Sequence, residues 1–296
     1  MQRRVLVGFL LGLCGVVVFG ATLPMTRLSL DDLGPWFISF GRATIGGVLA
    51  VGVLAAIGRP RPLRGRILVD LLLATATLVF IFPLLMAVAI QTVPAAHGGV
   101  VLGLLPLTTA LAAMLFAGER PGLPLVAASA VGAGLVAAFA LRNGAADGLG
   151  AGDGLLVLSV IACSSGYAIT GRLARSMGGW EVICYMLILA LPVNLVGTLL
   201  SFPARPEAVA LTSWAALAYL GVFSQFVGFF FWNTGLAMGG IAKVGQVQLL
   251  QTFVTVGLAW PVNGEVPDAE TLAFAAAVVA VVAFAQRTGR PRPPAP

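Results

Sequence analysis

Long apolar stretches alternate with short polar breaks along the whole chain. A helix that crosses a bilayer needs about 20 mostly apolar residues. Stretches of that length recur here, and glycine, proline or charged residues separate nearly all of them. The pattern predicts an all-α polytopic membrane protein with ten transmembrane helices, at approximately residues 5–24, 34–57, 67–90, 95–117, 122–141, 151–172, 180–201, 212–236, 241–262 and 269–286.

The composition indicates that a bilayer surrounds this protein. Hydrophobic residues form 59% of the chain and charged residues only 9%, whereas a soluble domain carries about 25% charge. The net charge of +6 does not indicate a nucleic-acid partner, because the basic residues lie in short loops rather than on one clustered face. The three cysteines lie within apolar stretches and have the spacing of neither a metal site nor a disulfide framework. No metal or cofactor is therefore expected.

The basic residues predict how the spans are oriented. If the N-terminus is cytoplasmic and ten spans alternate, the inner segments contain 13 of the 17 basic residues. This bias follows the positive-inside rule, and it places both termini in the cytoplasm of a multi-pass protein of the cell inner (plasma) membrane. Residues 288–296 are rich in proline, and we expect them to form a disordered cytoplasmic tail.

The second half of the chain repeats the first. Gly118-Glu119 recurs as Gly264-Glu265, 146 positions later. Residues 86–122 match residues 232–268 at nine positions without a gap. The chain thus divides into a five-helix repeat at 1–142, a linker at 143–150 and a second five-helix repeat at 151–287. Because five is odd, the two repeats are expected to be inverted relative to each other, which is typical of secondary transporters.

Three short motifs carry a resemblance to a known family. They are the Phe-Gly-Arg-Ala sequence at 40–43, the segment from Leu105 to Arg120, and its counterpart from Gln248 to Glu265. In order and spacing they resemble the EamA type of the drug/metabolite transporter superfamily. The resemblance implies two five-helix halves and transport of small metabolites, commonly export of amino acids or related compounds. The chain departs from the family pattern at Thr252, where the family often has proline.

Polar residues are most dense in the predicted ninth span. Gln248, Thr252 and Thr255 recur at i, i+4 and i+7, so they share one helical face, and Gln251 lies beside it. One interpretation is a stripe that faces the transport pathway and binds a polar substrate. The other is that these amides and hydroxyls only join neighbouring helices. Two long amides exceed what packing requires, and we expect all four residues to contact substrate.

Three further side chains are candidates for substrate binding: Tyr167 in the sixth span, Trp232 in the eighth and His97 in the fourth. The two aromatic residues suit an amphipathic or cationic solute, although packing is the alternative. His97 is the only histidine, and it lies near the end of its span. It is expected to contact substrate or to titrate, while an interfacial capping role is the alternative.

Glu119 and Glu265 are expected to have structural or gating roles, and the family resemblance implies such a role for Arg42. Arg42 lies inside the second span, where a charge is costly. The alternatives for Arg42 are an ion pair with Asp31 or Asp32, or direct binding of a substrate carboxylate. Each glutamate follows the end of an apolar helix, where the helix dipole disfavours a carboxylate. We therefore expect each glutamate to find a partner, such as the N-terminus of another helix or a loop arginine, and consider proton relay as the alternative.

These observations predict a secondary transporter that moves a small polar or amphipathic metabolite by alternating access. An amino acid or a related compound is the expected substrate, export is the expected direction, and protons are a candidate coupling ion. The alternative on the same fold is a flippase for lipids or lipid-linked sugars. An enzyme is not expected, because the predicted spans contain neither paired carboxylates nor a Ser-His pair deep in the membrane.

Overall fold

In a computed structural model, the described residues form helices that are joined by turns and short loops, with no strand among them. They are residues 2–57, 63–118 and 150–288, together with positions 127, 130, 131, 134, 135 and 138. The predicted all-α class is thus confirmed for this part of the chain. Most of the predicted fifth span, Glu119, most of the linker and the tail from 289 onward lie outside the described residues.

In the described part of the first half, one long helical segment, α3, is uninterrupted and the others are broken. A turn at Ala21 separates the first two helices, and a π-helical segment η1 joins α4 to α5. The elements are α1 (Gln2–Gly20), α2 (Thr22–Ser29), α3 (Pro35–Ile57), α4 (Gly65–Thr75), η1 (Ala76–Ile81), α5 (Phe82–Ala89), α6 (Ala95–Leu102) and α7 (Leu105–Ala117).

The second half begins with two long helices and continues with interrupted ones. A second π-helical segment, η4, joins α11 to α12, and a 3₁₀ segment, η5, precedes α14. The elements are α9 (Ala151–Met177), α10 (Gly179–Leu200), η3 (Pro206–Ala208), α11 (Leu211–Tyr219), η4 (Leu220–Val227), α12 (Gly228–Gly239), α13 (Ile241–Val244), η5 (Gly245–Gln248), α14 (Leu249–Asn263) and α15 (Ala269–Thr288).

Seven helical segments among the described residues are long and apolar enough to cross a membrane. They are Leu6–Ser29, Pro35–Ile57, Gly65–Ala89, His97–Ala117, Ala151–Met177, Gly179–Leu200 and Leu211–Gly239. They coincide with the predicted first to fourth and sixth to eighth spans. The predicted ninth span is divided into α13, η5 and α14, and the tenth corresponds to α15. Two ends differ from the prediction by five residues: the first span continues to Ser29 and the sixth to Met177.

The repeat is visible in the backbone. Shifting η1 by 146 positions places it over residues 222–227, within η4. Helix α7 ends at Gly118 with φ +68°, and α14 ends at Gly264 with φ +71°. This left-handed conformation closes many helices and strongly favours glycine. The paired Gly-Glu sequences therefore mark two equivalent helix ends.

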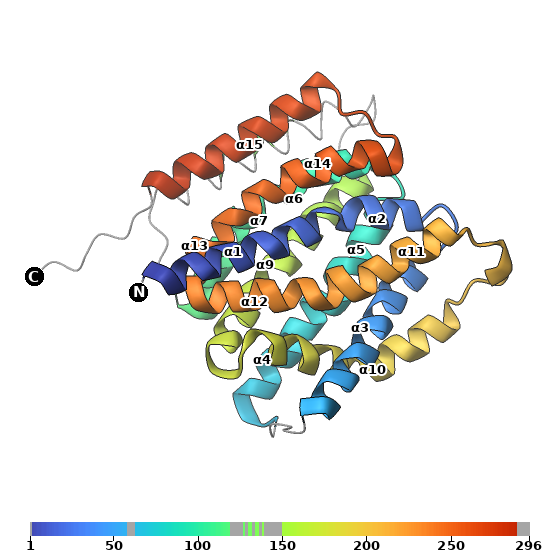
Figure 1. Cartoon of the computed structure of the whole chain (residues 1–296). Coiled ribbons are helices and arrows are strands. Elements are labelled where there is room, and N and C mark those ends of the chain that lie inside the picture. Colours follow the sequence, from blue (N-terminus) through green and yellow to red (C-terminus); the bar gives the residue numbers. More distant parts are fainter. Residues whose placement is uncertain are drawn as a thin grey trace, which may run out of the picture.

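The helices pack into one bundle, with α15 along one side of it (Figure 1). Helix α1 of the first half packs along α12 of the second, and α3 packs along α10 in the same way. Helix α9 contacts α4, η1, α5 and α7 of the first half. The helices of the two halves are thus interleaved, and side chains from both halves meet in the interior.

Helix α9 packs tightly against η1 at Gly166. A Cβ atom on Gly166 would overlap with Leu78 and would lie 2.7 Å from Thr77 Oγ1. Gly166→Ala is therefore expected to destabilise the protein by about 1–3 kcal/mol through overpacking. A lower melting temperature of the detergent-solubilised variant would show this. The matched control is Gly154→Ala on the same helix, where a Cβ atom would meet nothing within 4 Å. Equal melting temperatures for the two variants would contradict this packing argument.

Candidate functional site

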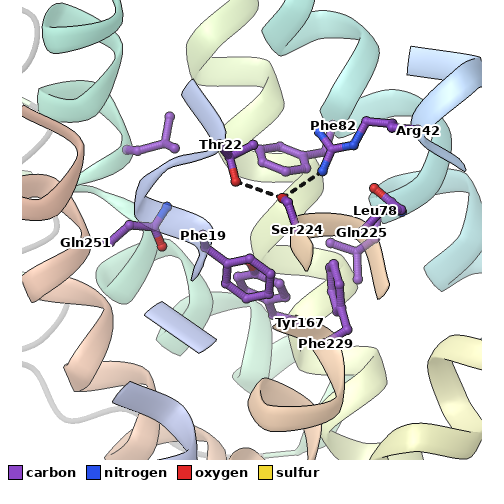
Figure 2. Close-up of a pocket in the computed structure, with 11 residues that line it drawn as sticks. Phe19, Thr22, Arg42, Leu78, Phe82, Tyr167, Ser224, Gln225, Phe229 and Gln251 are labelled. Carbon is purple, nitrogen blue, oxygen red and sulfur yellow. Dashed lines mark hydrogen bonds between the residues drawn. The ribbon is translucent and has the colours of Figure 1, made fainter. Parts of the chain in front are cut away.

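A pocket lies inside the bundle, between elements of the two halves. Figure 2 shows its lining, which comes from α1, α2, α3, η1, α5, α6, α9, η4, α12 and α14. The lining residues are Phe19, Thr22, Arg42, Leu78, Phe82, Leu102, Tyr167, Ser224, Gln225, Phe229 and Gln251. The cavity volume is only about 10 Å³, which is room for about one water molecule. The pocket is therefore contracted in this conformation.

The two π-helical segments supply equivalent positions to the pocket. Leu78 on η1 and Ser224 on η4 are 146 positions apart, and both line it. A π-helical turn rotates the side chains that follow it relative to a regular α-helix, and such turns are frequent at functional sites. The two halves thus contribute related backbone with different chemistry, an aliphatic side chain from η1 and a hydroxyl from η4.

Arg42 is a buried cation in this pocket, only 2% exposed. Its Nη2 donates a hydrogen bond to Ser224 Oγ at 2.8 Å, and Ser224 Oγ lies 2.8 Å from Thr22 Oγ1 (Figure 2). Among the described residues, its Nε has no hydrogen-bond partner and no carboxylate forms an ion pair with it. Asp32, which the sequence suggested as an ion-pair partner of Arg42, instead accepts hydrogen bonds from Ser213 Oγ and the Ala210 amide. An ion pair of Asp32 with Arg42 is therefore not formed.

Aromatic rings form one wall of the pocket. The Phe19 ring lies 5.1 Å from that of Phe229 and 6.4 Å from that of Tyr167, measured between ring centroids. Trp232 lies behind this wall, with its ring 5.3 Å from that of Tyr167. The wall offers an apolar surface beside a cationic group. Of the two predicted aromatic ligands, the structure places Tyr167 in the pocket lining and Trp232 against it.

The predicted polar stripe divides into residues with different surroundings. Gln251 lines the pocket, and its Oε1 is buried without a hydrogen-bond partner among the described residues. Gln248 and Thr252 are each 1% exposed, and their side-chain polar atoms also lack partners within that part of the chain. Thr255 Oγ1 instead donates to the Gly20 carbonyl at 2.8 Å. Thr255 thus joins α14 to α1, as the packing alternative describes.

His97 lies outside this pocket. Its Nε2 is 2.8 Å from Asp153 Oδ1, and the two residues are 8% and 7% exposed. Asp153 Oδ2 also accepts a hydrogen bond from the Gly150 amide at the start of α9. The pair links α6 of the first half to α9 of the second.

A second ion pair links the two halves at the other end of α9. Arg172 Nη2 lies 2.7 Å from Asp70 Oδ1, and Arg172 Nη1 donates to the Phe116 carbonyl. Asp70 belongs to α4 and Phe116 to α7. Helix α9 is thus bonded to the first half through a pair of polar side chains near each of its ends.

Glu265 has the kind of partner that its position requires. Its Oε1 accepts a hydrogen bond from the Ala95 amide at 3.1 Å, in the first turn of α6. A carboxylate is favoured at a helix N-terminus, where amides point outward and the dipole is positive. This contact ties the loop after α14 to α6. The equivalent Glu119 lies outside the described residues.

Part of the pocket lining was not predicted from the sequence. Phe19, Thr22, Leu78, Phe82 and Leu102 line it, but none was a candidate. Four of them are apolar residues in apolar spans and look like any lipid-facing or packing residue. Thr22 carried a weak signal, a hydroxyl inside the first span. Leu78 and Ser224 are placed by the π-helical segments η1 and η4, and the sequence pattern does not predict where an α-helix changes to a π-helix.

Comparisons with known proteins agree with this architecture. The model of the EamA-like transporter family matches residues 6–141 and 150–286. The transporter YdeK of Bacillus subtilis is 41% identical over 280 residues, which cover 95% of this chain and 97% of YdeK. A probable terminal-alkyne amino-acid exporter of Streptantibioticus cattleyicolor is 27% identical over 278 residues, covering 92% and 91% of the two chains. A solved crystal structure has the same fold, with a TM-score of 0.69, 20% identity and coverage of 95% and 98%. The chain therefore belongs to the EamA-like transporter family.

Proposed function

We propose that this protein is a secondary transporter that exports a small amphipathic metabolite bearing a carboxylate, most simply an amino acid, across the inner (plasma) membrane. The observation that carries the proposal is the buried guanidinium of Arg42 in the pocket between the halves. Among the described residues it has no carboxylate partner. The carboxylate of a substrate would complete this site.

The energetic argument rests on the cost of burying a charge. Taking an ion out of water costs several kcal/mol unless it is paired and hydrogen-bonded. Arg42 has one hydrogen bond to a neutral hydroxyl, which compensates only part of that cost. Arginine presents a fork of donors that fits a carboxylate in a bidentate way. A bound carboxylate would therefore gain an unusually strong interaction here.

The wall formed by Phe19, Tyr167 and Phe229 supports an apolar side chain on the substrate. Such a side chain would bury apolar surface against the rings, at about 25 cal/mol per Å². The relative from Streptantibioticus cattleyicolor, named as a probable amino-acid exporter, supports the same substrate class and direction. The proposed substrate thus has a carboxylate at Arg42 and an apolar group on the aromatic wall.

The contracted pocket supports alternating access as the mechanism. Space for about one water molecule cannot hold an amino acid, so binding requires the surrounding helices to separate. In transporters built from repeats, one bundle rocks against the other around a site near the midplane. The pairs His97–Asp153 and Asp70–Arg172 join the halves at the two ends of α9, so opening toward either side requires one pair to part. A proton gradient is the proposed driving force.

The proposed topology has ten spans in two inverted five-helix repeats, at 1–142 and 151–287, with both termini cytoplasmic. A cysteine in place of Arg64 would then lie on the cytoplasmic side, and one in place of Glu207 on the outer side. Both positions are exposed. In intact cells, a membrane-impermeant maleimide is expected to label Glu207→Cys and not Arg64→Cys, above the background of the three native cysteines. Labelling of both variants in intact cells would contradict the inverted arrangement.

Transport itself is tested with purified protein in liposomes. Vesicles preloaded with unlabelled leucine are expected to accumulate radiolabelled leucine by exchange, whereas vesicles preloaded with leucinamide, which lacks the carboxylate, are not. A panel of other apolar amino acids extends the test. Absence of exchange for the whole panel, together with translocation of a fluorescent lipid in the same vesicles, would overturn the proposal in favour of a flippase.

A further inference from the structure

The geometry points to Gln251 as the residue that recognises the amino group of the substrate. This inference rests on the proposed function and deepens it, because it specifies a zwitterion rather than any carboxylate. It follows from which polar atoms of the pocket lack partners and from where those atoms lie.

Gln251 carries an unused acceptor. It is 5% exposed, and its Oε1 is buried with no hydrogen-bond partner among the described residues. A buried polar atom without a partner costs about 1–3 kcal/mol, and such atoms in native proteins call for an explanation. A ligand that donates hydrogen bonds would satisfy this oxygen. A substrate ammonium group is such a donor.

The unused donors lie on the other side of the pocket. Arg42 Nε and Gln225 Nε2 are both buried without partners within the described part of the chain. In Figure 2, Gln251 lies on one side of the Thr22–Ser224 hydrogen bond, and Arg42 and Gln225 lie on the other. The pocket therefore has a donor end and an acceptor end. An α-amino acid has the complementary pair of groups, a carboxylate and an ammonium.

The composition of the lining explains why an amide takes this role. The lining residues in the part of the chain that the structure describes include no aspartate or glutamate. A carboxylate here would form an ion pair with Arg42, and the cation would then be less available for a substrate. A neutral amide oxygen accepts from an ammonium group without neutralising Arg42. Helix α14 positions this oxygen, and two further buried side chains, Gln248 at the end of η5 and Thr252 on α14, extend its polar surface.

The test compares ligands that differ in one group. Titration calorimetry of the whole protein in nanodiscs would use leucine and 4-methylpentanoate, which lacks the ammonium. The wild type is expected to bind leucine at least about 10-fold more tightly, the effect of one hydrogen bond to a charged group. In Gln251→Leu, which has a similar volume, this preference is expected to fall to within about 3-fold. In Gln251→Glu the affinity for both ligands is expected to fall, because the new carboxylate competes for Arg42, while leucine, whose ammonium group can pair with that carboxylate, stays preferred over 4-methylpentanoate.

The matched control places the same new charge at the donor end. Gln225→Glu is expected to weaken binding of both ligands and to keep their ratio near that of the wild type, because its carboxylate competes for Arg42. A wild-type protein that binds both ligands equally, or a Gln251→Leu variant that keeps the wild-type ratio, overturns the role of Gln251 and leaves the proposed function standing. If neither ligand nor any apolar amino acid binds, the proposed function fails as well.

Discussion

Replacing Arg42 with glutamine is expected to weaken leucine binding by about 100-fold and to abolish measurable exchange in liposomes. The guanidinium can donate two parallel hydrogen bonds to a carboxylate, and hydrogen bonds to charged groups contribute about 1.5–3 kcal/mol each. A loss of about 2.7 kcal/mol corresponds to a factor of 100 in the dissociation constant. Titration calorimetry and exchange of radiolabelled leucine would measure the two effects.

The melting temperature of the same variant shows whether Arg42 binds substrate or has the structural role expected from the sequence. Arg42 has little compensation for its burial, and replacement of an uncompensated buried charge is often neutral or stabilising. The melting temperature of Arg42→Gln is therefore expected to equal or exceed that of the wild type. Arg27→Gln is the matched control, because Arg27 donates to the Ile90 carbonyl outside the pocket. A large fall in melting temperature with unchanged leucine binding would show that Arg42 is structural.

Fastening either end of α9 to the first half is expected to stop transport completely. Asp153 and Arg172 are nineteen residues apart in the sequence, which is about 28 Å along a helix. In one variant cysteines would replace both Asp70 and Arg172, and in the other they would replace both His97 and Asp153. A short bifunctional thiol reagent would then cross-link the two cysteines of each variant. If one end must part in each half of the cycle, either cross-link traps the protein in one state. Leucine exchange is therefore expected to fall to background in both cases.

The controls identify the cross-link as the cause. Single-cysteine variants treated with the same reagent, and double variants treated with a monofunctional reagent, are expected to keep their own untreated rates. Cleavage of a disulfide-linked reagent by a reductant is expected to restore exchange. Full exchange in a protein cross-linked at both ends would show that α9 does not move relative to α4 and α6 during transport.

Local sequence signals located the helices and the repeat well. Gly118 and Gly264 were expected to close equivalent apolar stretches, and both adopt the left-handed conformation at helix ends. Glu265 was expected to need a partner, either a helix N-terminus or a loop arginine, and its Oε1 accepts a hydrogen bond from the Ala95 amide at the start of α6. Such features can be predicted because the end of a helix, the compensation of its dipole and the length of a span depend on residues that are close in sequence.

The pocket was predicted less completely. Gln251 and Tyr167 were expected to contact substrate, and both line it. Arg42 was expected to be structural or gating, yet its partner is Ser224, a residue 182 positions away. His97 was grouped with the substrate ligands, whereas the structure pairs it with Asp153 outside the pocket. In each case the deciding contact is made between helices that are distant in sequence.

The sequence by itself determined that this chain is a helical membrane protein built from two related halves. Hydrophobicity, glycine and charge act locally, so their pattern suffices to place helices and their ends. Only the tertiary structure decided which polar groups meet in the interior. In a membrane, lipid-facing and interior side chains are equally apolar, so periodicity does not show which face of a helix points inward. The rotation of each helix, and the π-helical segments η1 and η4, bring Arg42, Ser224 and Gln251 around one pocket.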